Sequence, residues 1–175
     1  MKQKITYCGV NAHFQNGRAE KRIRDLQDMA RTQLIHAQEI WPGVVSNNLW
    51  PYAIRYSNLV KNATTDTRVM ESPIEMFSQT PVWPKIKHFH PFGCPVYVLD
   101  GLLQSNKSIP KWNHRSRLAL NLGPSPRHAR SVALVLNLHT GMASPQYHVR
   151  YDHIFKTVKE GKKGYVNLNI HMRIP

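Results

Sequence analysis

The sequence predicts an α+β fold, in which helices come first and a small antiparallel β-sheet or barrel module follows. In residues 16–40 the apolar side chains recur every three or four positions, as on one side of an α-helix. After Pro95 they alternate with polar ones, which is the two-residue period of a half-buried strand. The predicted parts are a helical part, residues 1–92, a β module, residues 93–158, and a basic tail that frays, residues 159–175.

The first predicted helix begins near Asn16 and ends before Pro42 and Gly43. Asn16 suits the N-cap position, because its side-chain oxygen can accept a hydrogen bond from the free amides of the first turn. The apolar stripe of this helix consists of Ala19, Ile23, Leu26, Ala30, Leu34 and Ala37. A stripe of this length predicts that the helix buries one face.

Two further helices are predicted before the β module. The second runs from about Leu49 to Lys61, with Pro51 in its first turn, where proline is tolerated. The third is short and follows the capping box Ser72-Pro73-Ile74-Glu75, in which serine and glutamate each satisfy an amide at the helix start. The residues expected near one face of the second helix are Trp50, Ala53, Ile54 and Ser57.

Four strands are predicted, over residues 96–99, 117–122, 131–138 and 142–151. Thr140-Gly141 forms the turn of a hairpin whose second arm is residues 142–151. On that arm Tyr147, Val149 and Tyr151 share one face, while Gln146, His148 and Arg150 share the other. An apolar inner face and a cationic outer face are typical of a small half-solvated sheet.

The chain is strongly basic, with 24 Lys and Arg against 10 Asp and Glu and a formal net charge of +14. Residues 101–175 hold 12 basic and 2 acidic residues, so most of the excess lies there. Such a block attracts a polyanion, and nucleic acid is the commonest one inside cells. The alternative is a solvated basic surface without a specific partner.

The candidate nucleic-acid-binding cations lie in the β module. They are Lys111, Arg115, Arg117, Arg127, Arg130 and Arg150. Trp112 lies among them and could stack on a base, but we interpret it as an anchor that packs its loop onto the sheet.

Several classes of protein are excluded by what the sequence lacks. No apolar run approaches the 20 or so residues of a membrane span, and the N-terminus has no signal-peptide core, so no membrane partner is expected. Two cysteines, Cys8 and Cys94, indicate a reducing compartment, the nucleus or cytoplasm, and we interpret them as small packed residues. His88, His90 and Cys94 do not have a standard zinc spacing, and loop packing is the preferred interpretation.

Glu20 is the candidate catalytic and metal-binding residue. At 100° per residue it forms a column with Arg24, Gln27 and Arg31 that borders the apolar stripe. A glutamate in a first turn is also favoured by the helix dipole and can pair with Arg24 four positions on. The pattern alone therefore favours a structural role.

The run Gln15–Arg22 resembles the last catalytic helix of copia-type retrotransposon integrases, whose motif Asn-Gly-x-Ala-Glu-Arg carries the third carboxylate of an Asp, Asp, Glu triad. Other segments resemble the following part of these polyproteins in the same order. They are Leu49–Ala53, Ser72–Glu75, Phe92–Val98, Leu122-Gly123, His128–Ser131, Thr140-Gly141 and Ser144–Val149. The resemblance covers roughly residues 5–158.

The resemblance implies that residues 1–92 are the C-terminal helices of a ribonuclease-H-like integrase core. It implies DNA integration by a transposable element, through metal-dependent DNA strand transfer with Mg²⁺ or Mn²⁺, and assigns Glu20 as a catalytic metal ligand. DNA is the implied partner, and RNA is an alternative. The chain would then be a fragment of an integrase.

The chain departs from the family in its acidic residues. None of the 19 residues before Glu20 is Asp or Glu, and Asp25 and Asp28 lie about 120–140° around the helix from it. We therefore expect the chain alone to be catalytically incomplete and to bind no metal stably. The stripe would also lack the sheet it packs against in the family, so the second helix or a second copy of the chain should cover it. A non-enzymatic nucleic-acid-binding or assembly module derived from such an element is the alternative function.

Overall fold

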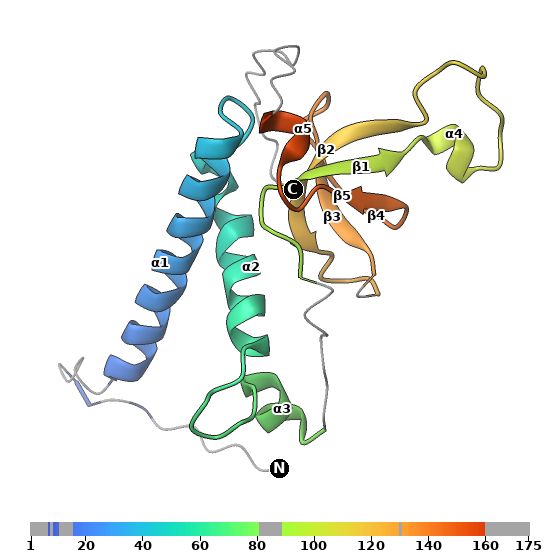
Figure 1. Cartoon of the computed structure of the whole chain (residues 1–175). Coiled ribbons are helices and arrows are strands. Elements are labelled where there is room, and N and C mark those ends of the chain that lie inside the picture. The colour runs from blue at the N-terminus through green and yellow to red at the C-terminus, as the bar shows by residue number, and fades with distance from the viewer. Residues whose placement is uncertain (1–6, 8, 11–15, 81–88, 130, 160–175) are drawn as a thin grey trace.

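The computed structural model describes residues 7, 9–10, 16–80, 89–129 and 131–159. It is an α+β fold, as predicted, with helices beside one antiparallel sheet (Figure 1). The helices are α1 (Gly17–Ile40), α2 (Trp50–Ala63), α3 (Pro73–Ser78), α4 (Gly101–Gln104) and α5 (Lys156–Lys159), and a 3₁₀ turn spans Asn47–Leu49. The strands are β1 (Pro95–Leu99), β2 (Ser116–Pro124), β3 (Ala133–Asn137), β4 (Ala143–Gln146) and β5 (Val149–Tyr151). Cys8, His88, Arg130 and the predicted tail from residue 160 onward lie outside the described residues.

Helix α1 buries only the second half of its apolar stripe. Ala30, Leu34 and Ala37 are buried, whereas Ile23 is 56% exposed. Asn16 is at the N-cap as predicted, but its side chain makes no capping hydrogen bond. The reason is its backbone, which has φ −92° and ψ 9° and not the extended conformation that directs a cap side chain toward the first turn.

Helix α2 lies between α1 and the sheet (Figure 1). Its buried residues are Ala53, Tyr56 and Ser57, a spacing of three and four that follows one helical face. Of the four residues expected near one face, Ala53 and Ser57 are buried, whereas Trp50, the first residue of the helix, is exposed. Tyr56 is also buried and faces the sheet.

The capping box before α3 is confirmed. Ser72 is buried, its hydroxyl accepts from the Glu75 amide at 3.4 Å, and the Glu75 carboxylate accepts from the Ser72 amide at 2.9 Å. No helix in the described part of the chain is both long and apolar enough to cross a membrane.

The sheet has the strand order β4-β3-β2-β1-β5, with every neighbouring pair antiparallel. The predicted single strand over residues 142–151 is wrong. It breaks at Tyr147 and His148 into β4, which pairs with β3, and β5, which pairs with β1 at the opposite edge. The break was hidden in the sequence because the alternation of apolar and polar residues continues across it.

This connection requires the sheet to curl into a barrel-like shape. In a flat sheet the first and fifth strands would lie about 19 Å apart, since neighbouring strands are about 4.8 Å apart. From Gln146 to Val149 the chain makes three Cα steps, which span at most about 11 Å. The two edges must therefore approach each other, and the backbone amide of Leu99 reaches the His148 carbonyl at 3.0 Å.

The inner face of the curled sheet is buried, and so is the part of its outer face that packs on the helices. The interior of the curl holds Val96, Val98, Ala119, Val135 and Phe155. The outer face of β2 and β3 packs on the helices in one apolar cluster, which includes Leu34, Leu49, Ala53, Leu120, Leu122 and Leu136. The second half of the α1 stripe thus belongs to a core shared by helices and sheet, while the domain division at residue 92 remains a prediction.

Candidate nucleic-acid interface

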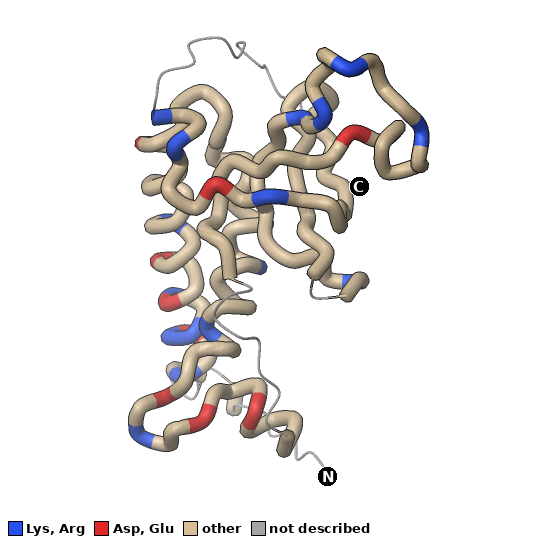
Figure 2. Tube along the Cα trace, turned by 45° about the vertical axis from the view of Figure 1, so that its right-hand side comes forward, with Lys and Arg blue, Asp and Glu red and all other residues tan. Residues whose placement is uncertain are grey.

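The connection between β1 and β2, residues 100–115, extends away from the helices and contains α4 (Figure 1). Two contacts of Asp100 hold its base: the carboxylate accepts from the Leu102 amide at 2.8 Å, and the backbone amide donates to the Arg115 carbonyl at 2.9 Å. The connection carries Lys107, Lys111 and Arg115, and all three side chains are exposed. Figure 2 shows blue Lys and Arg positions along the projecting connection. A backbone-anchored loop therefore presents three cations to solvent.

Trp112 is part of this connection and is 89% exposed. The interpretation of Trp112 as an anchor on the sheet is therefore wrong. The connection is held instead by backbone hydrogen bonds, such as that from the Asn113 amide to the Pro110 carbonyl at 3.0 Å. The Lys111 ammonium lies 5.2 Å from the centre of the indole ring, which places a charge and a stacking surface together.

Arg115 and Arg150 line one hollow of about 500 Å³, which we call the arginine hollow. It also includes Tyr97, Leu99, Ser116, His148 and Val149. The strand register explains this meeting, because Arg150 lies opposite Tyr97 and Ser116 lies opposite Leu99 on β1, the strand between β2 and β5. Two residues that are far apart in sequence thus form one cationic surface next to the β1–β2 connection.

Two other predicted cations, Arg117 and Arg127, do not join this surface. Arg117 lies opposite the buried Val98, is only partly exposed, and its Nη1 atom is buried without a hydrogen-bond partner among the described residues. Arg127 is exposed beyond the other end of β2, about 30 Å away along the strand at 3.3 Å per residue. Of the predicted set, the structure brings together Arg115 and Arg150, and Lys111 lies on the same connection as Arg115.

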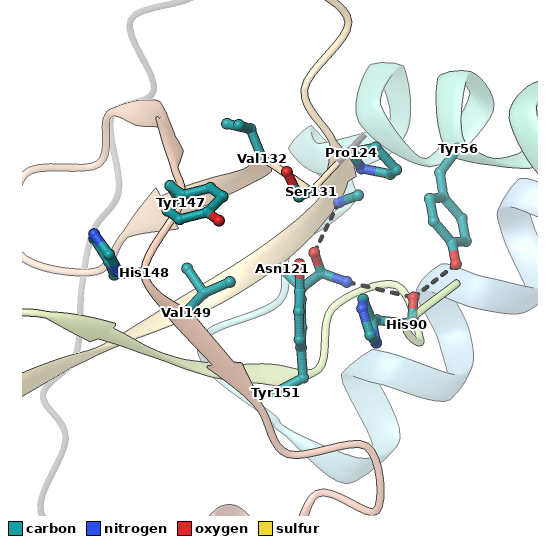
Figure 3. Close-up of a pocket in the computed structure, with 11 residues that line it drawn as sticks. Tyr56, His90, Asn121, Pro124, Ser131, Val132, Tyr147, His148, Val149 and Tyr151 are labelled. Carbon is teal, nitrogen blue, oxygen red and sulfur yellow. Dashed lines mark hydrogen bonds between the residues drawn. The ribbon is translucent and has the colours of Figure 1, made fainter. Parts of the chain in front are cut away.

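A second hollow, of about 370 Å³, lies beside the junction of β4 and β5 (Figure 3), and we call it the tyrosine hollow. Its lining includes Tyr56, His90, Asn121, Ser131, Tyr147, His148, Val149 and Tyr151. Most of these residues were not predicted as site residues. The signal that could have found them is the concentration of aromatic residues and histidines at the end of the hairpin.

Buried hydrogen bonds hold one wall of the tyrosine hollow. Asn121, 1% exposed, donates from its amide nitrogen to the Pro91 carbonyl at 2.9 Å and accepts from the Gly123 amide at 3.0 Å. The Tyr56 hydroxyl donates to the His90 carbonyl at 2.6 Å (Figure 3). Because α2, β2 and the segment before β1 are joined in this way, the wall is preformed.

The tyrosine side chains of the hollow differ in their exposure and in their ring contacts. The Tyr151 ring is stacked on His90, with ring centres 3.5 Å apart, and burial raises the pKa of its hydroxyl to about 12, so the hydroxyl stays protonated at neutral pH. Tyr147 is 63% exposed, and its ring contact is an edge-on one with His148. Tyr147 therefore offers the accessible ring.

Glu20 lies in the first turn of α1 and is exposed, as are Arg24, Gln27 and Arg31. Glu20 and Arg24 form no ion pair. Within the described ranges no group of three or more His, Cys, Asp or Glu side chains could hold a metal ion. The described residues around Glu20 therefore do not form a Mg²⁺ site by themselves, since such a site needs several converging oxygen ligands.

The interpretation of Cys94 as a packed residue is confirmed. Its side chain is fully buried, and burial raises the pKa of the thiol to about 12, so it is not a thiolate at neutral pH. His90 has other contacts: its Nδ1 lies 2.6 Å from His153 Nε2, and its ring stacks on Tyr151.

No family model, curated protein or solved structure matches this chain.

Proposed function

We propose that the chain binds nucleic acid through its β module, as a segment of a copia-type retrotransposon integrase that takes part in DNA integration. The observation that carries the binding proposal is the exposure of Lys111, Trp112 and Arg115 on one projecting connection, with Arg150 beside them. The order of the integrase-like motifs in the sequence supports the family.

The physical basis for binding is charge together with an accessible ring. Each Lys or Arg that neutralises a phosphate releases a counterion, which favours binding at low salt and carries no sequence information. An exposed indole adds stacking on a base, which is worth about 1–3 kcal/mol and tolerates any base. DNA is the proposed target because the parent reaction joins DNA, and RNA is the alternative.

In this proposal Glu20 supplies one carboxylate to a ribonuclease-H-like site that binds Mg²⁺ or Mn²⁺. The remaining carboxylates come from outside the described residues, because these do not form a metal site themselves. The chain alone is then catalytically incomplete.

A salt titration tests nucleic-acid binding. We expect the affinity for duplex DNA to fall with the logarithm of salt concentration by about 0.9 per neutralised phosphate. Arg115→Ala should reduce that slope by about one. The matched control is Arg68→Ala, because Arg68 is an exposed arginine that pairs with Asp66 outside the β module. An affinity for DNA that does not change with salt concentration would contradict the proposed nucleic-acid binding.

A strand-transfer assay with Mg²⁺ or Mn²⁺ tests the catalytic part. We expect no product from the chain alone. Product that disappears in Glu20→Gln would show that the chain is an active enzyme and would contradict the proposed incompleteness.

One observation favours a second candidate function, assembly through α1. Ile23 is 56% exposed, although α1 is fixed on α2 at this end by a hydrogen bond from Arg22 to Asn62 at 2.8 Å. An apolar surface on a fixed helix suits a protein contact, including one with a second copy of the chain. Light scattering should show a lower mass for Ile23→Asp together with Leu26→Asp if this face assembles, and an unchanged mass would reject that function.

A further inference from the structure

We infer that the tyrosine hollow is a binding pocket for one unpaired base of a nucleic-acid strand, with the adjoining arginine hollow holding the phosphates of the same strand. The inference rests on the proposed nucleic-acid binding and sharpens it, because it names the form of nucleic acid that the chain recognises. It concerns residues that the charge pattern of the sequence did not single out.

The size and walls of the tyrosine hollow suit a flat aromatic ligand. Its volume of about 370 Å³ falls within the range of about 300–1,000 Å³ for small-molecule pockets. Tyr147 presents an exposed ring at one side, and Val149 and Tyr151 continue the same wall (Figure 3). A base could therefore stack on Tyr147 without displacing another ring, since the contact of Tyr147 with His148 is edge-on at 80°.

Hydroxyl groups around the hollow can read the polar edge of a base. The Tyr151 hydroxyl can donate a hydrogen bond, because a tyrosine is protonated at neutral pH and burial raises the pKa of this one further, to about 12. The Ser131 hydroxyl can donate or accept. The amide of Asn121 is already occupied by Pro91 and Gly123 and serves to hold the wall.

The charge around the two hollows favours a nucleotide over a cationic ligand. Neither hollow is lined by Asp or Glu. The two hollows share His148 and Val149, so they meet at the start of β5, and Arg115 and Arg150 line the second of them. An aromatic base attached to an anionic phosphate has this same order of groups, whereas a cation would be repelled by the arginines.

The base must be unpaired to use this pocket. In a duplex each base is stacked and paired, and only an extruded or single-stranded base can lie with its face on a protein ring. We therefore expect preference for a single strand, or for a duplex with an unpaired end, over a blunt duplex of the same sequence.

The experiment compares binding of two fluorescent probes by anisotropy, a single-stranded deoxyoligonucleotide and its blunt duplex. Unlabelled AMP serves as a competitor. Tyr147→Ala removes the ring, and Tyr147→Phe is the matched control because it keeps the ring and removes only the hydroxyl. Met142→Ala is a second control, since Met142 is an exposed side chain near the same hairpin that lines neither hollow.

The supporting result is that Tyr147→Ala weakens single-strand binding by about 5- to 100-fold, which corresponds to the loss of one stacked base. Tyr147→Phe and Met142→Ala should bind as the wild type does, and blunt-duplex binding should be the same for all four proteins. An unchanged affinity of Tyr147→Ala for the single strand would overturn the inference and leave the proposed function intact. Competition by AMP at the concentration of the oligonucleotide would overturn the assignment to a strand.

Absence of binding to both the single strand and the duplex at low salt would overturn the proposed function, and the inference with it. The two failures are therefore distinguishable. A circular dichroism spectrum of each variant, compared with that of the wild type, shows that the loss of binding comes from the ring and not from unfolding.

Discussion

The core shared by helices and sheet and the β1–β2 connection are built in opposite ways. In the core, Leu49, Ala53 and Leu120 are completely buried and come from separate elements. In the connection, Trp112 is 89% exposed, although it is the largest kind of side chain. The difference indicates that stability and recognition depend on separate residues, so substitutions should affect one without the other.

The largest expected effect is on the core. Leu120→Ala removes a buried side chain and leaves a cavity, so it should lower the free energy of unfolding by about 2–5 kcal/mol. Leu102→Ala, at a half-exposed position of α4 in the connection, is the matched control and should change it by less than about 1 kcal/mol. Urea unfolding followed by circular dichroism measures both, and equal losses would contradict the comparison.

A smaller effect is expected where β2 touches α2. Gly123 has φ +99°, and a Cβ there would lie 2.6 Å from Cδ2 of the Tyr56 ring. Gly123→Ala therefore strains the backbone and pushes on a buried ring, which should cost about 1–3 kcal/mol of unfolding free energy. Gly101→Ala is the control, because a Cβ at that position meets no atom within 4 Å. A stability equal to that of the wild type would show that the barrel and α2 can move apart at no cost.

The smallest effect on stability is expected in the connection itself. Trp112→Ala should leave the unfolding free energy within about 0.5 kcal/mol of the wild type, because the indole packs on nothing in the core. Its affinity for nucleic acid should fall by about 5- to 100-fold, and Trp112→Phe should retain most of it. Loss of stability without loss of affinity would reverse the proposed roles of the two regions.

Local patterns in the sequence predicted local structure well. The stripe from Ala19 to Ala37 predicted α1, and Ser72 with Glu75 predicted the start of α3. Both predictions succeeded because each feature depends on residues within four positions of each other. The pairing of β3 with β4 is also local, and the predicted turn at Thr140-Gly141 indicated it. Such contacts need no knowledge of distant residues.

The features that the sequence did not reveal all depend on distant partners. Residues 142–151 were predicted as one strand because the curl of the sheet, which sends β5 to β1, leaves no mark on the alternation. The meeting of Arg115 and Arg150 depends on that same pairing. The exposure of Trp112 depends on how the connection is anchored, and hydrophobicity alone had favoured its burial.

Tyr147 and His148 connect β4 and β5, the two edge strands of the sheet. A protease that cut between them would leave β5 attached to its neighbour by a three-residue pairing, free to peel away. Both margins would then offer unpaired amides and carbonyls to other chains, which is the geometry that starts aggregation. Cleavage at this one dipeptide would therefore promote aggregation of the folded protein and would also disrupt its proposed binding surface.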